Sequence, residues 1–163
     1  MNRRDKINYY LDIAQTILIR GTCLRRNYGV VVVSNDEIIS TGYSGAPRGR
    51  KNCIDIKYCV REKFNIPRGE RYEMCRAIHA EANAIISASR DRMIGSTLYL
   101  VGIEYKTKQF VSQPNPCAMC KRMIINSGIK KVIVRDNAED YRIIDVDSQL
   151  VNNDESLENT LGY

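Results

Sequence analysis

Apolar residues recur at helical spacing near the start of the chain and predict an amphipathic helix. The positions on its apolar face are Ile7, Tyr10, Leu11, Ala14, Ile17 and Leu18. We expect this helix over about residues 5–20, with Gly21 as its C-terminal cap.

The pattern then changes to β-branched runs. The runs Val30 to Val33 and Ile38 to Thr41 flank Asn35-Asp36, a pair that favours a tight turn, so we expect a β-hairpin. A segment rich in Gly, Arg, Cys and Pro follows over residues 43–73. Loops of that length in a compact domain are usually functional or held by additional contacts.

Helices and strands alternate over the rest of the chain. We expect helices over about residues 77–89 and from Cys117 to Gly128, and strands over residues 96–101, 131–135 and 141–146. This order predicts an α/β domain over residues 1–151, in which helices cover a sheet through right-handed crossovers. Residues 152–163 are polar and acidic, which predicts a frayed C-terminal tail.

Composition narrows the class of protein. With 163 residues and 44% hydrophobic content, the chain is long enough for one domain with a core. The net charge of +6 fits an anionic partner, but the basic residues are dispersed, which argues against a nucleic-acid-binding surface. No segment approaches the ~20 apolar residues of a membrane span, and the N-terminus lacks a signal-peptide run. We therefore expect a soluble cytoplasmic protein, in which six cysteines indicate metal binding or catalysis before disulfides.

Two short motifs, each at an expected helix start, supply the ligands of a zinc site. They are His79-x-Glu81 and Pro116-Cys117-x-x-Cys120. The two cysteines share one face of their helix, and a helix N-terminus lowers the pKa of a thiol. One histidine and two cysteines leave the fourth coordination position of a catalytic zinc to water. Zinc acidifies that water, and Glu81, which is not a ligand, is placed to take its proton and deliver it to a substrate.

These motifs together are the signature of zinc nucleobase deaminases. Longer stretches around them resemble the deoxycytidylate (dCMP) deaminase family over about residues 5–135, namely residues 22–26, 41–47, 75–85, 95–99 and 124–129. The resemblance implies a three-layer cytidine-deaminase-like fold, with a mixed five-stranded sheet flanked by helices. It also implies a zinc ion between two helix starts and hydrolysis of dCMP to dUMP and ammonia.

The resemblance also suggests how the substrate is held. The cytosine ring is expected to lie between His79 and an apolar wall, with the backbone of Ala80 as a contact. Arg25, followed by Arg26, is expected to bind the 5′-phosphate, because the family's basic residue falls just before the first strand.

One departure from the family pattern concerns ligand binding. The usual Gly-Tyr-Asn-Gly reads Gly42-Tyr43-Ser44-Gly45 here, and Ser44 has a shorter reach than asparagine toward a sugar or an effector nucleotide. The resemblance implies a homo-oligomer, either a hexamer or a dimer. The departure leaves open both regulation by deoxynucleoside triphosphates and dCMP itself as the substrate.

Outside the two motifs, the cysteines are Cys23, Cys53, Cys59 and Cys75. Structural zinc sites often combine distant cysteine pairs, and some dCMP deaminases carry a second, structural zinc near these positions. Our hypothesis is a four-cysteine zinc site, and the alternative is that these residues are buried as small apolar side chains.

Two other functions are compatible with the motifs. One is a zinc deaminase acting on another cytosine or adenine nucleotide or nucleoside. The other is a non-catalytic zinc protein that binds nucleotides.

Overall fold

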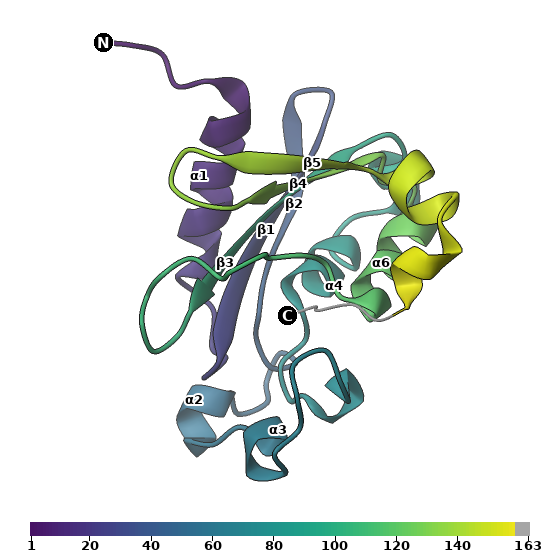
Figure 1. The fold of residues 1–163 in the computed structure, drawn as a ribbon. Helices are drawn as coiled ribbons and strands as arrows, with labels where there is room; N and C mark the ends of the chain where they lie inside the picture. The colour runs from purple at the N-terminus through teal and green to yellow at the C-terminus, as the bar shows by residue number, and fades with distance from the viewer. Residues whose placement is uncertain (159–163) are drawn as a thin grey trace.

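The protein is built in three layers around a central sheet. The structure, a computed structural model, describes residues 1–158, so residues 159–163 of the expected tail lie outside it. Helix α1 (Lys6–Leu18) covers one face of the sheet, and α4 (Ala80–Ile85) and α6 (Ala118–Ser127) cover the other (Figure 1). This is the predicted three-layer arrangement.

The sheet contains five strands in the order β2-β1-β3-β4-β5. Their bounds are β1 Arg26–Ser34, β2 Glu37–Tyr43, β3 Thr97–Glu104, β4 Lys131–Arg135 and β5 Tyr141–Asp145. β3 and β4 are parallel and are connected through α6, whereas the other neighbours are antiparallel. The prediction of a mixed five-stranded sheet is confirmed.

The continuous β-branched run of β1 is explained by burial on both faces of the sheet. Val30 and Val32 pack into the core beneath α4 and α6, whereas Val31 and Val33 pack into the core beneath α1. Successive side chains of a strand point to opposite faces. A strand covered on both sides therefore needs apolar residues at every position.

Local turn and cap residues set the ends of these elements. Asp5 caps α1 by accepting a hydrogen bond from the backbone N–H of Asn8 at 2.9 Å. Asn35 and Asp36 form the hairpin turn with positive φ angles of 50° and 64°. The predicted glycine cap is wrong, because α1 ends at Leu18 and its C-cap residue is Ile19, which lies in the right-handed helical region. Gly21 is instead a site of close approach, where an added Cβ would lie 2.5 Å from the side chain of Asn27.

The helix expected over residues 77–89 is shorter than predicted. It is α4 alone, Ala80–Ile85, and a separate short helix, α5 (Arg90–Met93), begins beyond the expected range. The hydroxyl of Ser87 donates a hydrogen bond to the backbone carbonyl of Asn83 at 2.6 Å, and Ser89 occupies the N-cap position of α5. Serine side chains compete for backbone hydrogen bonds in this way and end a helix.

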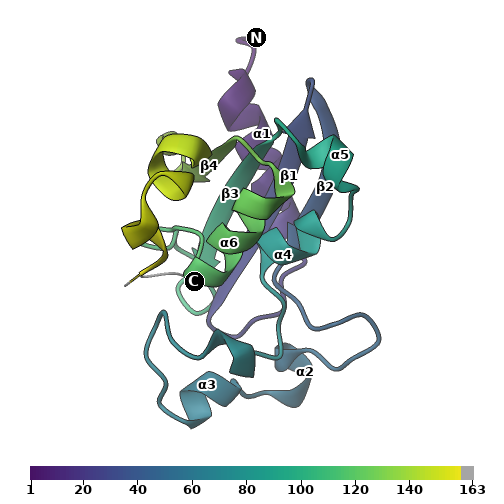
Figure 2. The same ribbon diagram turned by 90° about the vertical axis from the view of Figure 1, so that its right-hand side faces the viewer.

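The long segment after β2 carries short helices of its own. α2 (Cys53–Ile56) and α3 (Val60–Lys63) lie together beyond one end of the sheet, as Figure 2 shows from the side. A 3₁₀ turn, Tyr72–Met74, then leads into α4. This segment therefore connects the edge strand β2 to the helix that bears the histidine motif.

The expectation of a frayed tail does not hold for residues 152–158. A π-helical turn at Asp147–Val151 and a 3₁₀ turn at Asp154–Leu157 follow β5. Lys121 of α6 donates a hydrogen bond to the carbonyl of Ser156 at 3.0 Å. Among the described residues, no helix combines the length and the apolar character needed to cross a membrane.

Candidate metal centre

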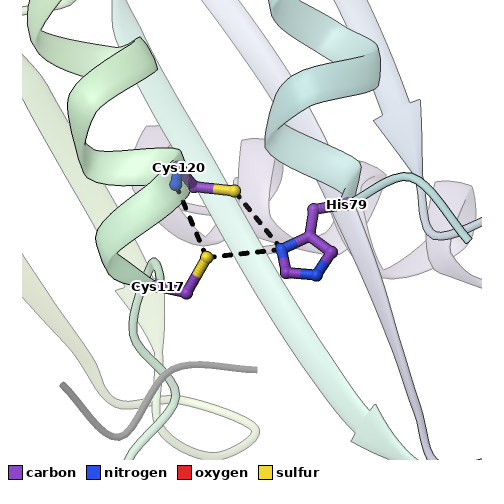
Figure 3. Close-up of side chains that lie close together, drawn as sticks. All are labelled: His79, Cys117 and Cys120. Atoms are coloured by element: carbon purple, nitrogen blue, oxygen red, sulfur yellow. Dashed lines mark hydrogen bonds between the residues drawn. The ribbon is translucent and has the colours of Figure 1, made fainter. Parts of the chain in front are cut away.

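His79, Cys117 and Cys120 meet between the starts of α4 and α6 (Figure 3). The Nδ1 atom of His79 lies 3.4 Å from the Sγ atom of each cysteine, and all three residues are buried. A tetrahedral zinc, with bonds of about 2.0–2.1 Å to nitrogen and about 2.3 Å to sulfur, places its donor atoms roughly 3.5–3.8 Å apart. The donor types and their spacing therefore fit zinc.

Both helices present their N-termini to this cluster. His79 is the N-cap residue of α4, and its extended backbone (ψ 149°) precedes the first helical turn. Cys117 caps α6, and the backbone N–H of Cys120 donates to its Sγ atom at 3.5 Å. The positive ends of the helix dipoles favour thiolates at this position.

The pKa values of the three side chains are shifted in different directions. A hydrogen bond with Cys120 lowers the pKa of Cys117 to about 4, assisted by His79 and opposed by burial. The same pairing, together with burial, raises the pKa of Cys120. Burial alone would lower the pKa of His79, but hydrogen bonds with Cys117 and Cys75 raise it to about 9. A metal bound here has to displace protons from the site.

Glu81 is fully buried in the first turn of α4. Its carboxyl group hydrogen-bonds with Cys120 and contributes to the raised pKa of that thiol. It is nevertheless not a member of the three-residue donor cluster. Glu81 is thus adjacent to the ligands, and its role as the proton carrier stays a prediction.

The sequence of this chain matches a known protein family. Residues 4–136 match the family described as the cytidine and deoxycytidylate deaminase zinc-binding region. The chain belongs to this family. Its zinc-binding region is therefore that of a deaminase family, and the buried cluster of His79, Cys117 and Cys120 is the candidate site for the metal.

Individual relatives of this deaminase family differ in length. The deoxycytidylate deaminase of Mycobacterium phage D29 is 36% identical over 138 residues, which cover 82% of this chain and 96% of that protein. The deoxycytidylate deaminase of Schizosaccharomyces pombe is 32% identical over 126 residues, which cover 77% of this chain but 35% of that protein. The apo crystal structure of dCMP deaminase from cyanophage S-TIM5 has a TM-score of 0.57 and 25% identity, covering 84% of this chain and 88% of that one.

The remaining cysteines, Cys23, Cys53, Cys59 and Cys75, all line one cavity. His79 lines the same cavity. Their sulfur atoms are not gathered at ligand spacing, since the one cluster of three or more such donors within 4.8 Å among the described residues is His79 with Cys117 and Cys120. Burial raises the pKa of Cys23, and raises that of Cys53 to about 11 with a contribution from the neighbouring cysteines. The second zinc site stays a prediction.

Of the residues expected to bind substrate, the two arginines line a cavity, and Ser44 is bonded to the backbone of the sheet. Arg25 and Arg26 line the cavity beside His79, and Arg26 forms an ion pair of 2.7 Å with Glu104. Ser44 is buried, and its hydroxyl oxygen accepts a hydrogen bond from the backbone N–H of Tyr28 at 3.1 Å. Ser44 therefore holds β1 to the end of β2, which the sequence did not indicate.

The last predicted substrate contact is Ala80. It is fully buried as the first residue of α4, directly after His79. Its position fits a backbone contact near the metal centre, and the contact itself stays a prediction.

Sequence reasoning missed three residues around the centre. Asn83 of α4 donates a hydrogen bond to the carbonyl of Tyr43 at 2.8 Å and ties the helix to β2. The ring of Tyr72 lies against His79, and the guanidinium of Arg61 lies over that ring. No spacing rule connects these positions, because their contacts depend on how the long segment after β2 folds.

Proposed function

We propose that this protein is a zinc-dependent deaminase that converts dCMP and water to dUMP and ammonia. The observation that carries the proposal is the buried cluster of His79, Cys117 and Cys120 with Glu81 in the adjoining helical turn. The relative from phage D29, matched over 96% of its length, is named deoxycytidylate deaminase and supports dCMP as the substrate.

The roles of the residues follow from their positions. A zinc ion held by His79, Cys117 and Cys120 would supply Lewis-acid activation of water near neutral pH. The carboxylate of Glu81 takes a proton from the water that adds at C4 and gives it to N3 of the cytosine ring; it then carries the second proton of that oxygen to the amino group, which leaves as ammonia. Because Glu81 is fully buried, bulk water does not compete for these protons.

We assign the 5′-phosphate to Arg25 and Arg26. Both line the cavity that His79 also lines. The Arg25 side chain has the weaker ion pair, with its Nε atom 3.8 Å from Glu62, so it is the more available of the two. A charge-assisted, bidentate bond from a guanidinium to a phosphate favours a nucleotide over its nucleoside.

A substrate panel tests this function. Ammonia release by the zinc-loaded protein should be measured with dCMP, dCTP, deoxycytidine, cytidine monophosphate and adenosine. We expect kcat/KM for dCMP to exceed that for deoxycytidine by at least about tenfold, because a bond to a charged group contributes roughly 1.5–3 kcal/mol. Turnover of another compound alone would overturn dCMP as the substrate. No turnover of any compound would favour a nucleotide-binding zinc protein.

We also propose a second, structural zinc bound by Cys23, Cys53, Cys59 and Cys75. Its support is the shared cavity, together with the charge around it. Three arginines that line the cavity have buried nitrogen atoms without a hydrogen-bond partner among the described residues, namely Arg25 Nη1, Arg61 Nε and Arg76 Nε. A zinc ion with four thiolates carries a net negative charge that such donors would stabilise.

The zinc content of cysteine variants tests the second site. We expect two zinc ions per wild-type chain and one in Cys53→Ser, because a structural site with three remaining ligands binds zinc much more weakly. Cys117→Ser is the matched control and should also hold one ion, lost from the other site. Equal zinc content in wild type and Cys53→Ser, by metal analysis of the purified proteins, would contradict the proposal.

The proposal extends to assembly, regulation and location. We propose that residues 1–151 form the deaminase domain and that residues 152–163 are a polar, acidic C-terminal segment, tied to α6 at Ser156. We also propose that the protein acts as a homo-oligomer, a dimer or a hexamer. An apolar groove lined by Ile85, Met119 and Met123 beside α4 and α6 supports a second copy as the partner. Deoxynucleoside triphosphates are the effectors to test, and the cytoplasm is the compartment that we assign to this nucleotide chemistry.

A further inference from the structure

The imidazole of His79 is bounded by an aromatic ring as well as by the two helices. Tyr72 precedes α4 in the 3₁₀ turn, and its ring centroid lies 4.9 Å from that of His79 at an interplanar angle of 78°. Edge-to-face contacts of this kind are favourable and depend on the relative orientation of the two rings. The ring plane of His79 is therefore coupled to the position of Tyr72.

Tyr72 is itself held from two directions. The guanidinium carbon of Arg61 lies 4.3 Å from the centroid of the Tyr72 ring, a cation–π distance. The hydroxyl oxygen of Tyr72 accepts a hydrogen bond from the backbone N–H of Gly69 at 3.1 Å. The ring face is thus held by Arg61 of α3 and the hydroxyl by Gly69, in the segment between α3 and α4.

Arg61 is well placed to hold that ring still. It is 4% exposed, and its Nη2 atom donates to the carbonyl of Pro67 at 2.7 Å. A buried guanidinium bonded to the backbone has few alternative rotamers, so the ring that it covers is restrained. The contacts run in one series, from Arg61 through Tyr72 to His79.

The orientation of the imidazole, which also hydrogen-bonds with Cys75, matters because Nδ1 is the nitrogen atom that faces Cys117 and Cys120. Nδ1 lies 3.4 Å from both sulfur atoms, and rotation of the ring about its bond to the side chain would turn Nδ1 away from them. Loss of a contact that orients a metal-binding side chain typically weakens metal affinity by about 10–100-fold. We infer that Tyr72 is a positioning residue that fixes the ring plane of His79, and that Arg61 holds Tyr72 in place. This inference rests on the zinc-binding part of the proposed function.

Two substitutions of Tyr72 separate the ring from the hydroxyl. Zinc affinity should be measured by competition with a chromophoric chelator, and ligand geometry by the visible absorption bands of the cobalt(II)-substituted protein. We expect Tyr72→Leu to bind zinc about tenfold more weakly and to shift the cobalt bands. Tyr72→Phe keeps the ring and should remain within about twofold of wild-type zinc affinity.

A second cation–π pair in the same segment supplies the matched control. Lys63 lies 5.5 Å from the ring of Tyr58, which is 45% exposed. Tyr58→Leu should leave zinc affinity and the cobalt bands unchanged. Wild-type affinity and bands in Tyr72→Leu would overturn the inference. So would an equal loss in Tyr58→Leu, because it would indicate general loosening of the segment.

The test does not depend on a single variant or on catalysis. If Tyr72→Leu does not fold, Arg61→Met in the Cys53→Ser protein, in which only the His79 site should hold zinc, removes the restraint on the Tyr72 ring, and we expect zinc affinity to fall by about threefold. Unchanged affinity in Arg61→Met would then overturn the inference. None of these measurements uses dCMP, so a protein that fails the substrate panel still tests the role of Tyr72.

Discussion

Glu81→Gln is expected to lower kcat for dCMP by about 10²–10⁴-fold while the protein keeps its zinc. Glutamine has nearly the same shape but cannot accept a proton from water at neutral pH. Glu81 is fully buried and lies outside the donor cluster of His79, Cys117 and Cys120. The substitution therefore removes proton transfer without removing a ligand.

Glu73→Gln is the matched control for this experiment. Glu73 is exposed and pairs with Arg71, so the same chemical change at that position should leave kcat unaltered. Both variants should be assayed for ammonia release and for zinc per chain. Wild-type turnover by Glu81→Gln would contradict its role as the proton carrier, and loss of zinc together with activity would assign Glu81 to zinc retention instead.

The candidate ligands could be predicted from sequence because each depends on a local feature. Cys117 and Cys120 lie at the start of one helix, and a separation of three residues places them on the same face. His79 is the N-cap residue directly before α4 and has an extended backbone conformation. Only the meeting of the two helix starts required the fold, and the alternation of helices and strands already indicated that fold.

The long segment after β2 shows where prediction stops. Its two short helices and the burial of Arg61 do not follow from periodicity, because arginine is rarely buried and patterns assign it to the surface. The contact of Arg61 with Tyr72 arises only when the segment folds back toward α4. The sequence therefore predicted the candidate ligands of the centre but not the residues that pack against them.

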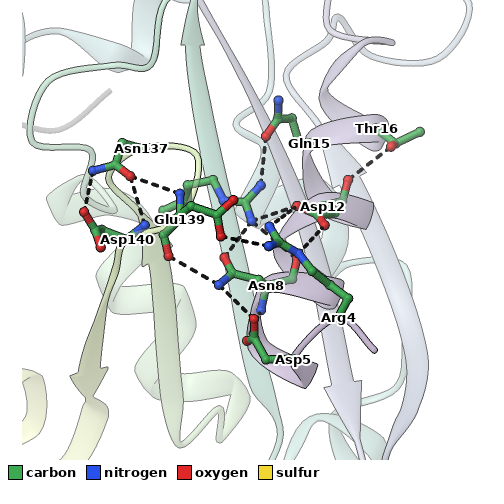
Figure 4. A network of polar contacts seen from close by, with 10 residues as sticks. Arg4, Asp5, Asn8, Asp12, Gln15, Thr16, Asn137, Glu139 and Asp140 are labelled. Atoms are coloured by element: carbon green, nitrogen blue, oxygen red, sulfur yellow. Dashed lines mark hydrogen bonds and ion pairs between the residues drawn. The ribbon is translucent and has the colours of Figure 1, made fainter. Parts of the chain in front are cut away.

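A buried polar network at the other end of the domain was missed for the same reason. Arg135 of β4 is 2% exposed and bonds to the side chains of Asn8, Asp12 and Gln15 on α1 (Figure 4). Burial alone would raise the pKa of Asp12, but hydrogen bonds from Arg4 and Arg135 lower it. These partners are more than a hundred positions from Arg135 in the chain, so no local pattern connects them.

Two glycines show how closely helices approach the sheet on its opposite faces. A Cβ added at Gly42 of β2 would lie 2.2 Å from the carbonyl oxygen of Ala80 and 2.6 Å from the backbone nitrogen of Ala84 in α4. A Cβ added at Gly29 of β1 would lie 2.1 Å from the carbonyl oxygen of Ala14 in α1. Because the obstructing atoms are backbone in both cases, the helix has to move away from the sheet.

Gly42→Ala and Gly29→Ala should therefore have similar effects on stability and different effects on activity. We expect each to lower the free energy of unfolding by about 1–3 kcal/mol or more, measured by thermal or urea unfolding. Gly42→Ala displaces the start of α4, where His79 and Glu81 lie, so its kcat per zinc-loaded chain should fall at least about tenfold, since a 1 Å displacement costs up to about 10²-fold. Gly29→Ala displaces α1 and should keep the wild-type kcat in the folded fraction. Equal kcat values in the two variants would show that the position of α4 against β2 does not limit catalysis.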